Sequence, residues 1–345
     1  MTVGTRRKLT VGVCLALAVP GAPLALGARD AQAAFPGENG RIAFGVTKLR
    51  WPPPSECPPD PHGCPEPERL SAAIDTVLPG GRARRVLFPL PPESVATNSV
   101  PAWSPNGRLL AMQLASGELA ILRRDGTMLQ QLPQLTDADS EPAWSPNGRR
   151  LAFAGNQPCL YCRWLYTVRP DGTGLHRVIA EGAYSPAWSV TGRIAFVNYD
   201  DTYLRRIGIK DGLYSVRPDG SGLRLLYSGG ALGPGLTPDW SPDGRRIAFA
   251  AASREAPDNK EIFTVRANGR GLRQLTAFKT RDTATDPTWS PDGKSIAFLR
   301  KDGLYVMSST GRGLRRVLAA RPQHPDHPYR AWTELSAPTW QPLPG

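Results

Sequence analysis

Short runs in which hydrophobic and polar residues alternate recur along most of the chain, and a glycine-containing turn separates the runs of each pair. The pattern is clearest in LYTVRPDGTGLHRV (165–178) and LYSVRPDGSGLRLL (213–226). Related segments occur at 119–132, 262–275, 304–317 and, in a weaker form, 74–87. Alternation with a period of two on both sides of such a turn is typical of a β-hairpin. Because helical periodicity is nearly absent, the pattern predicts an all-β protein.

A second motif, Pro-x-Trp followed by a turn and an apolar strand, alternates with these hairpins. It reads VPAWSPNGRLLAM at 100–112 and TPDWSPDGRRIAF at 237–249. Its tryptophans, separated by 41, 44, 52, 49 and 51 residues, are Trp103, Trp144, Trp188, Trp240, Trp289 and Trp340. Each repeat therefore holds four short strands, and we expect the tryptophans to fill the space between neighbouring repeats.

Four-stranded units that recur every 40–50 residues or so are the signature of a β-propeller, in which sheets pack radially around a channel. The segment 35–44 contains the second half of the motif without its tryptophan, and APTW (337–340) supplies the missing strand at the other end. Pairing of APTW with the blade formed by residues 41–87 would close the ring and remove an open sheet edge. The sequence predicts one domain over residues 34–345, a six-bladed β-propeller of four-stranded antiparallel blades.

The recurring Ser-Pro-Asp-Gly suits a tight turn at each position, since Pro presets its own φ and Gly tolerates the backbone conformation at the end of the turn. A catalytic interpretation would need a base next to each serine, and no histidine accompanies any copy. We therefore expect these residues to be structural, and we predict no catalytic residue in the repeats.

The series PxWSPDGxxIAF followed by LYxVxxDGxxLRxLT resembles the TolB-type, WD-repeat-like propeller family. The resemblance extends over residues 35–342 and concerns the propeller only, because TolB carries an α/β domain before its propeller and this chain shows none there. It implies a propeller fold.

The first 33 residues are typical of a signal peptide. A basic start at 6–8 precedes an apolar run over 9–26, and Ala-Gln-Ala at 31–33 matches a cleavage site. The alternative of a retained anchor is disfavoured because two prolines interrupt the run. The paired arginines leave twin-arginine export open. We expect a secreted, periplasmic or cell-wall-associated protein with no transmembrane segment in the mature chain.

The net charge of +12 falls to +9 when residues 1–33 are removed. This excess favours polyanionic surfaces such as cell-wall polymers or acidic lipid. Nucleic acid is not an expected partner, because the chain lacks a basic helix or a stacking motif.

Four cysteines remain in the mature chain, and an oxidising compartment favours disulfides. We expect the local pairs Cys57–Cys64 and Cys159–Cys162, with cross-pairing and a zinc site as the alternatives.

In an antiparallel four-stranded blade, the turns between strands one and two and between strands three and four lie on one face of the ring. This short-turn face carries the SPDG and PDG turns. The long connections emerge on the opposite, long-loop face, where binding is expected because variable loops on a rigid scaffold usually carry it. The candidate binding residues there are Trp51, Tyr199, Asp200, Asp201, Tyr203, Arg281, His324, Asp326 and His327.

Two further charged groups lie in the same connections. One is acidic and contains Asp137, Asp139 and Glu141, and the other mixes signs and contains Lys279, Arg281, Asp282 and Asp286. No cofactor is expected, although such acidic groups leave Ca²⁺ or another divalent metal open.

Two functions are consistent with this pattern. The first is a monomeric binding or scaffold module that holds a protein or an envelope polymer on its long-loop face. The alternative is a propeller hydrolase or lyase with a metal or carboxylates at the channel mouth. Three or more carboxylates or histidines converging there would favour the enzyme.

Overall fold

The computed structural model describes residues 36–50, 68–90, 101–114, 117–132, 141–155, 163–179, 182–198, 210–229, 237–252, 259–278, 283–320 and 332–343. All regular elements in these ranges are strands, and no helix that could cross a membrane occurs among them. The predicted signal peptide lies outside the described residues and stays a prediction.

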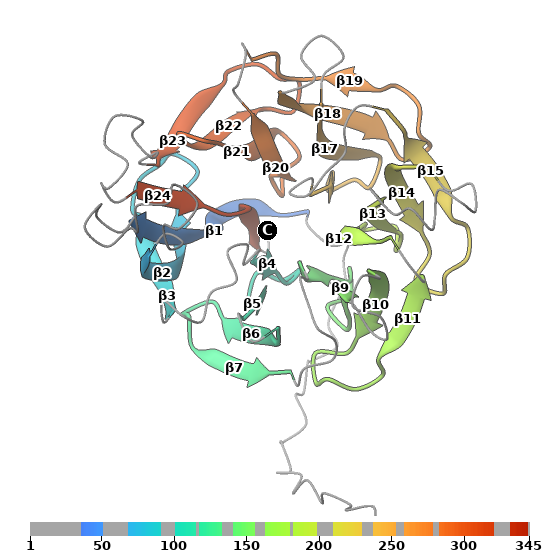
Figure 1. The fold of residues 1–345 in the computed structure, drawn as a ribbon, viewed down its shortest axis with the longest axis horizontal. Coiled ribbons are helices and arrows are strands. Elements are labelled where there is room, and N and C mark those ends of the chain that lie inside the picture. Colours follow the sequence, from blue (N-terminus) through green and yellow to red (C-terminus); the bar gives the residue numbers. More distant parts are fainter. Residues whose placement is uncertain are drawn as a thin grey trace, which may run out of the picture. The chain divides into compact units, whose positions relative to one another are not determined.

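The strands form six antiparallel sheets arranged as blades around a central channel (Figure 1). Blade 1 contains β1 (Glu38–Arg50), β2 (Glu68–Val77), β3 (Arg85–Leu90), β24 (Trp332–Leu335) and β25 (Thr339–Leu343). Blade 2 contains β4 (Ala102–Trp103), β5 (Leu109–Gln113), β6 (Leu119–Arg123) and β7 (Met128–Gln131). Blade 3 contains β8 (Ala143–Trp144), β9 (Leu151–Gly155), β10 (Trp164–Val168) and β11 (His176–Ile179).

The remaining three blades repeat this order along the chain. Blade 4 contains β12 (Tyr184–Trp188), β13 (Ile194–Asn198), β14 (Gly212–Val216) and β15 (Arg224–Tyr227). Blade 5 contains β16 (Asp239–Trp240), β17 (Arg246–Ala252), β18 (Lys260–Arg266) and β19 (Arg273–Gln274). Blade 6 contains β20 (Ala284–Trp289), β21 (Ser295–Arg300), β22 (Gly303–Ser308) and β23 (Arg315–Ala319). The predicted six-bladed β-propeller is confirmed.

The ring closes between the two ends of the described chain. The inner edge of β1 pairs with β25, where Ile42 lies opposite Trp340 and Ala43 opposite Thr339. Farther along β1, Val46 lies opposite Leu335 of β24. As predicted, the APTW segment is therefore the innermost strand of the N-terminal blade.

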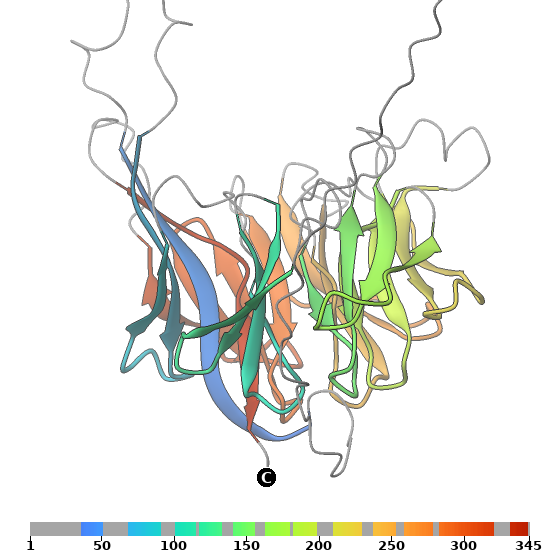
Figure 2. The same ribbon diagram turned by 90° about the horizontal axis from the view of Figure 1, so that it is seen from below.

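The SPDG-type turns use one hydrogen-bond arrangement, which blade 3 illustrates. The Ser145 hydroxyl donates to Asn147 Oδ1 over 2.9 Å and accepts from the Arg150 amide over 2.8 Å, while the Gly148 amide donates to the Ser145 carbonyl over 2.8 Å. Because the hydroxyl is occupied on both sides by its own turn, the serine is a turn-forming residue. The short turns lie at the end of the ring that faces down in Figure 2.

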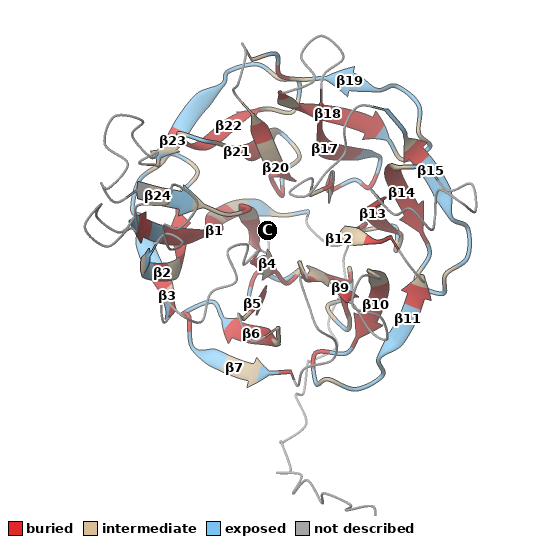
Figure 3. Ribbon diagram, viewed as in Figure 1, coloured by how far each residue is buried: buried red, intermediate tan, exposed pale blue. Residues whose placement is uncertain are grey.

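The hydrophobic core lies between the blades. Trp144 of blade 3, for example, packs in one cluster with Ile121 of blade 2 and Phe153 of its own blade. Trp340 joins Phe44 and Val306 in the cluster between blades 1 and 6. All six repeat tryptophans are at most 7% exposed. The outermost strands β19 and β23 are mainly exposed, as Figure 3 shows.

The turn between the third and fourth strands of one blade contacts the backbone of the fourth strand of the preceding blade. Gly126, with φ of +92°, lies against the carbonyl of Leu87, and a Cβ at this glycine would overlap that oxygen. Gly81 meets the carbonyl of Val317 in the same way, so the contact also joins blade 1 to blade 6.

Candidate binding site in the channel

The innermost strands direct two side chains each towards the channel. Alternate residues of a strand point to opposite faces, so the residue before the proline and the residue between proline and tryptophan share the channel side. The cavity between them measures about 100 Å³. Besides prolines and tryptophans, its lining consists of Ala102, Glu141, Ala143, Ser185, Ala187, Thr237, Asp239, Thr288 and Thr339. Since each innermost strand runs from the long-loop face, the residues before the prolines lie nearest to that face.

Two carboxylates in the channel wall link blades 5 and 6 reciprocally. Thr237 of blade 5 donates to Asp286 Oδ1 over 3.1 Å. In return, Asp239 Oδ2 of blade 5 accepts from the Thr288 hydroxyl over 3.0 Å and from the Trp289 amide over 2.6 Å. These bonds hold both carboxylates in fixed positions at the boundary of the two blades.

A third carboxylate, that of Glu141, enters the channel from blade 3. The pKa of Glu141 is raised to about 7, mainly by burial and also by the charge of Asp286. A hydrogen bond with Ser185 acts in the opposite direction and lowers the pKa. The charge of Asp286, from blade 6, therefore acts on the carboxyl group of Glu141, from blade 3.

Burial also raises the pKa of both aspartates. The pKa of Asp239 is about 7, although the Trp289 amide and the Thr288 hydroxyl favour its ionised form. The pKa of Asp286 is about 6, and its bonds to Thr285 and Thr237 and the charge of Lys260 act against burial. The site therefore carries a variable number of protons near neutral pH, and a cation entering it would favour the ionised forms.

The backbone is strained at two positions of this wall. Ser185 has φ of +50° and Asp286 has φ of +53°, and each precedes a proline. A residue before proline normally adopts an extended conformation, and left-handed φ values in residues other than glycine are concentrated at functional sites. The strain lies next to the carboxylates.

The predicted binding residues lie outside the described part of the chain. This holds for Trp51, Tyr199, Asp200, Asp201, Tyr203, Arg281, His324, Asp326 and His327, and for Cys57, Cys64, Cys159 and Cys162. These assignments stay predictions. Among the described residues, no three His, Cys, Asp or Glu side chains gather closely enough to hold a metal ion.

The structure brings Glu141 and Asp286 together from the two charged groups noted in the sequence. It adds Asp239, which was not among the predicted site residues. The signal was present in the repeat itself: the residue between proline and tryptophan is alanine or threonine in five copies and aspartate in one. Asp239 is thus the one copy that carries a carboxyl group at this position, which faces the channel, and this difference from the other copies was visible in the sequence.

Comparison with known proteins shows what this chain is similar to in fold. No protein-family model matches it, and no curated protein matches it in sequence. The structure superposes on TolB from Acinetobacter baumannii with a TM-score of 0.59 and 16% identity, over 89% of this chain and 68% of that one. It superposes on a chain of the nidogen/laminin complex with a TM-score of 0.59 and 12% identity, over 88% of this chain and 100% of that one. At these identities the likeness concerns the propeller fold alone.

Proposed function

We propose that this protein is an exported binding module whose channel mouth, on the long-loop face, receives a positively charged group of a partner protein or envelope polymer. The observation that supports the proposal is that Glu141 and Asp239 both line the cavity, and that the charge of Asp286 acts on Glu141. Among the described residues that line the cavity there is no lysine or arginine to neutralise them. A cation from a partner would supply the missing charge.

The cavity admits a side-chain head group. Its volume of about 100 Å³ well exceeds the roughly 10–15 Å³ that one water molecule needs on the same measure, so an ammonium or guanidinium group can enter. Arginine or lysine of a polypeptide, or an amino group of a polymer, fits this description. The long connections would then contact the rest of the partner.

A hydrolase or lyase is the second candidate, because a carboxyl group with a pKa near 7 suits general acid–base catalysis at neutral pH. The geometry gives it less support. Asp239 and Asp286 are each held by a hydroxyl group of the neighbouring blade, which gives both carboxyl groups a role in joining the blades. Turnover of an added polyuronate by the wild-type protein, abolished in Asp239→Asn, would favour the enzyme.

The test is a selection of phage-displayed random peptides on the immobilised mature protein. We expect the selected peptides to share a lysine or arginine at one position. Their affinity should fall by about tenfold or more in Asp286→Asn, because loss of one partner of a buried charge pair costs about 2 kcal/mol or more. Affinity should also rise from pH 5.5 to pH 8, because the carboxylates with raised pKa values ionise over that interval.

The matched control is Glu38→Gln, which removes a negative charge from an exposed position of β1 outside the channel. Its affinity for the same peptides should stay within about twofold of wild type. Selected peptides without a basic residue, or with unchanged affinity for Asp286→Asn, would exclude the channel mouth as the binding site.

A further inference from the structure

Blades 3, 4 and 5 carry a dense group of arginines on the short-turn face, opposite the channel mouth. Their six turns, which we call the arginine arc, contain eleven arginines and only three carboxylates. The arc comprises residues 145–150, 168–176, 189–193, 216–224, 241–246 and 265–273. With eleven arginines and three carboxylates, the arc carries a formal net charge of +8 in three consecutive blades.

Within each blade the arginines face one another. In blade 5, Arg246 and Arg266 lie directly opposite each other on β17 and β18. In blade 4, guanidinium nitrogens of Arg217 and Arg193 lie 2.9 and 3.5 Å from the point where a Cβ of Gly222 would be. In blade 3, Arg169 and Arg150 approach Gly174 in the same way, at 3.2 and 3.6 Å. Two guanidinium groups thus converge on one glycine of the turn.

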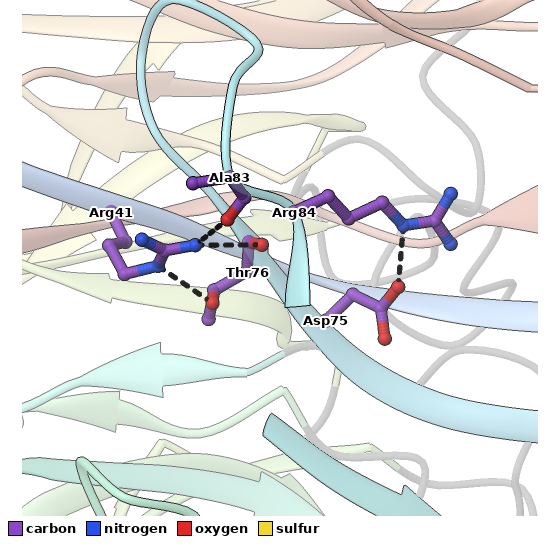
Figure 4. Close-up of polar contacts among 5 residues, drawn as sticks. All are labelled: Arg41, Asp75, Thr76, Ala83 and Arg84. Carbon is purple, nitrogen blue, oxygen red and sulfur yellow. Dashed lines mark hydrogen bonds and ion pairs between the residues drawn. The ribbon is translucent and has the colours of Figure 1, made fainter. Parts of the chain in front are cut away.

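In blades 3 and 4 the hairpin itself holds one arginine of the pair, Arg150 and Arg193 respectively. Arg193 donates from Nε to the Ser215 hydroxyl over 3.2 Å and from Nη2 to the Ser215 carbonyl over 2.9 Å and to the Gly222 carbonyl. Figure 4 shows the same arrangement in blade 1, where Arg41 bonds to Thr76 and to the carbonyl of Ala83. Because these bonds use only part of the donors, further N–H groups are held in place for a ligand.

In blades 3 and 4 the second arginine of the pair is tied to a hydroxyl of its turn. Arg217 Nη1 donates to the Ser221 hydroxyl over 3.3 Å, and Arg169 Nη1 donates to the Thr173 hydroxyl over 3.2 Å. Both side chains are exposed. Their guanidinium groups are therefore accessible and already oriented.

Three carboxylates face eleven arginines in the arc, so they offset only part of its positive charge. Asp171 accepts the amide and the hydroxyl of Thr173, and Asp243 accepts the hydroxyl of Ser241 and the amide of Arg245, so each caps its own turn. In the described part of the chain, none of the ion pairs involves an arginine of the arc. The pKa of Arg193 is lowered by burial and then by the charges of Arg224 and Arg217, which shows that like charges crowd here.

Like charges directly opposite each other destabilise a sheet, so the Arg246/Arg266 pair of blade 5 is unfavourable without an anionic partner. The converging arginines of blades 3 and 4 repel one another in the same way. We propose that the arginine arc binds a linear phosphate polymer, with one phosphate group at each arginine pair. Two converging guanidinium groups suit a phosphate, because its free oxygens can accept hydrogen bonds from both groups. A carboxylate has two oxygens, and one guanidinium group can occupy both of them. The repetition over three blades suits a chain with phosphates at regular intervals.

The test is the binding of inorganic polyphosphate to the purified mature protein by isothermal titration calorimetry at several salt concentrations. We expect measurable affinity that weakens as salt rises, and a loss of about tenfold or more in the triple variant R169Q/R217Q/R266Q. Single inorganic phosphate should bind much more weakly than the polymer, because it can occupy one pair at a time.

The matched control is R82Q/R124Q/R312Q, which removes three exposed arginines from the corresponding turns of blades 1, 2 and 6. This variant should keep its affinity within about threefold of wild type, and both variants should unfold at the wild-type temperature. Equal losses in the two variants would overturn the assignment to the arc. Polygalacturonate or phosphatidylglycerol vesicles bound as tightly as polyphosphate would overturn the assignment to a phosphate polymer.

Discussion

Asp239 occupies a position at which the other five innermost strands carry alanine or threonine. A single substitution in a structural repeat thus places a carboxyl group in the channel wall. The neighbouring blade holds that carboxyl through the Trp289 amide and the Thr288 hydroxyl. Burial dominates these bonds and raises the pKa of Asp239 from 3.8 to about 7. At the level of the residue, a small change in the motif produces a group that titrates near neutral pH.

The raised pKa of Asp239 predicts how stability changes with pH. Between about pH 4 and pH 7 the folded protein keeps a proton that the unfolded chain releases, so the free energy of unfolding falls as pH rises through that window. Asp239→Asn removes this contribution. At pH 8 we expect the free energy of unfolding of the variant to exceed that of wild type by up to about 4 kcal/mol, which corresponds to a shift of roughly three pKa units. The variant should therefore unfold at a higher temperature.

Thermal unfolding monitored by circular dichroism at pH 4, 6 and 8 measures this effect. The difference between Asp239→Asn and wild type should grow from pH 4 to pH 8. Glu38→Gln, at an exposed position, should show no such growth. A difference that stays constant with pH would contradict the raised pKa.

At the level of the element, the outer hairpin turn also connects neighbouring blades. The glycine of this turn lies against a carbonyl of the preceding blade, as Gly126 does with Leu87 and Gly220 with Val178. Its left-handed φ and the close approach require a residue without a Cβ. This explains why the Gly of the hairpin motif recurs in every blade, including blade 1, where the rest of the motif is degenerate.

Two glycine substitutions separate the effect of backbone conformation from that of close approach. Gly126→Ala should destabilise the protein by about 2–4 kcal/mol, because it combines an unfavourable φ with an overlap at the Leu87 carbonyl. Gly192→Ala should cost only about 1 kcal/mol, because Gly192 has φ of +82° but no atom within 4 Å of its Cβ position. Urea unfolding of both variants provides the comparison. Equal losses would mean that the contact between blades contributes nothing to stability.

The strands and turns were predictable because each is encoded locally, by alternation and by Gly- and Pro-containing turns. The irregularities between strands were not. In blades 3 and 4 the register shifts between the third and fourth strands, at Leu165/Tyr166 and Leu213/Tyr214. Blade 6 has the same shift at Leu304/Tyr305, so the bulge recurs at one position of the repeat. The alternation of apolar and polar residues does not reveal it, because a bulge adds one unpaired residue to the ladder.

At the level of the whole molecule, the pairing of β1 with β25 decides whether the ring is closed. Removal of residues 336–345 would leave the inner edge of β1 without the partner that pairs with Ile42 and Ala43. It would also remove Trp340 from the cluster between blades 1 and 6. An unpaired sheet edge promotes association, so we expect a truncated protein that unfolds less cooperatively and forms oligomers.

Size-exclusion chromatography with light scattering, together with thermal unfolding, measures both effects. Removal of residues 344–345 alone, which leaves β25 intact, is the control and should behave like wild type. A monomeric truncated protein with an unchanged unfolding transition would show that closure by β25 is dispensable.

The ring and its closure followed from the order of the repeats, whereas the site in the channel did not. Glu141, Asp239 and Asp286 come from blades 3, 5 and 6, and their approach depends on the packing of the whole ring. The sequence indicated Glu141 and Asp286 only as members of charged groups in connections. The pKa values of these groups depend on burial, which residue order does not reveal. The arginine pairs likewise become apparent only when the register of the strands is known.

The pairing of β1 with β25 also sets the order of events during synthesis. Arg41 and Gln341, which are bonded across the closure, are 300 residues apart in the chain. At about 5–20 residues per second, β1 waits roughly 15–60 s for its inner neighbour to be made. Throughout that interval the other blades can form from contacts within their own repeats, but the last cluster of the core cannot. The nascent protein is thus an incomplete ring until its final strand is made. A factor that delays folding until synthesis or transport is complete would act on the unpaired inner edge of β1.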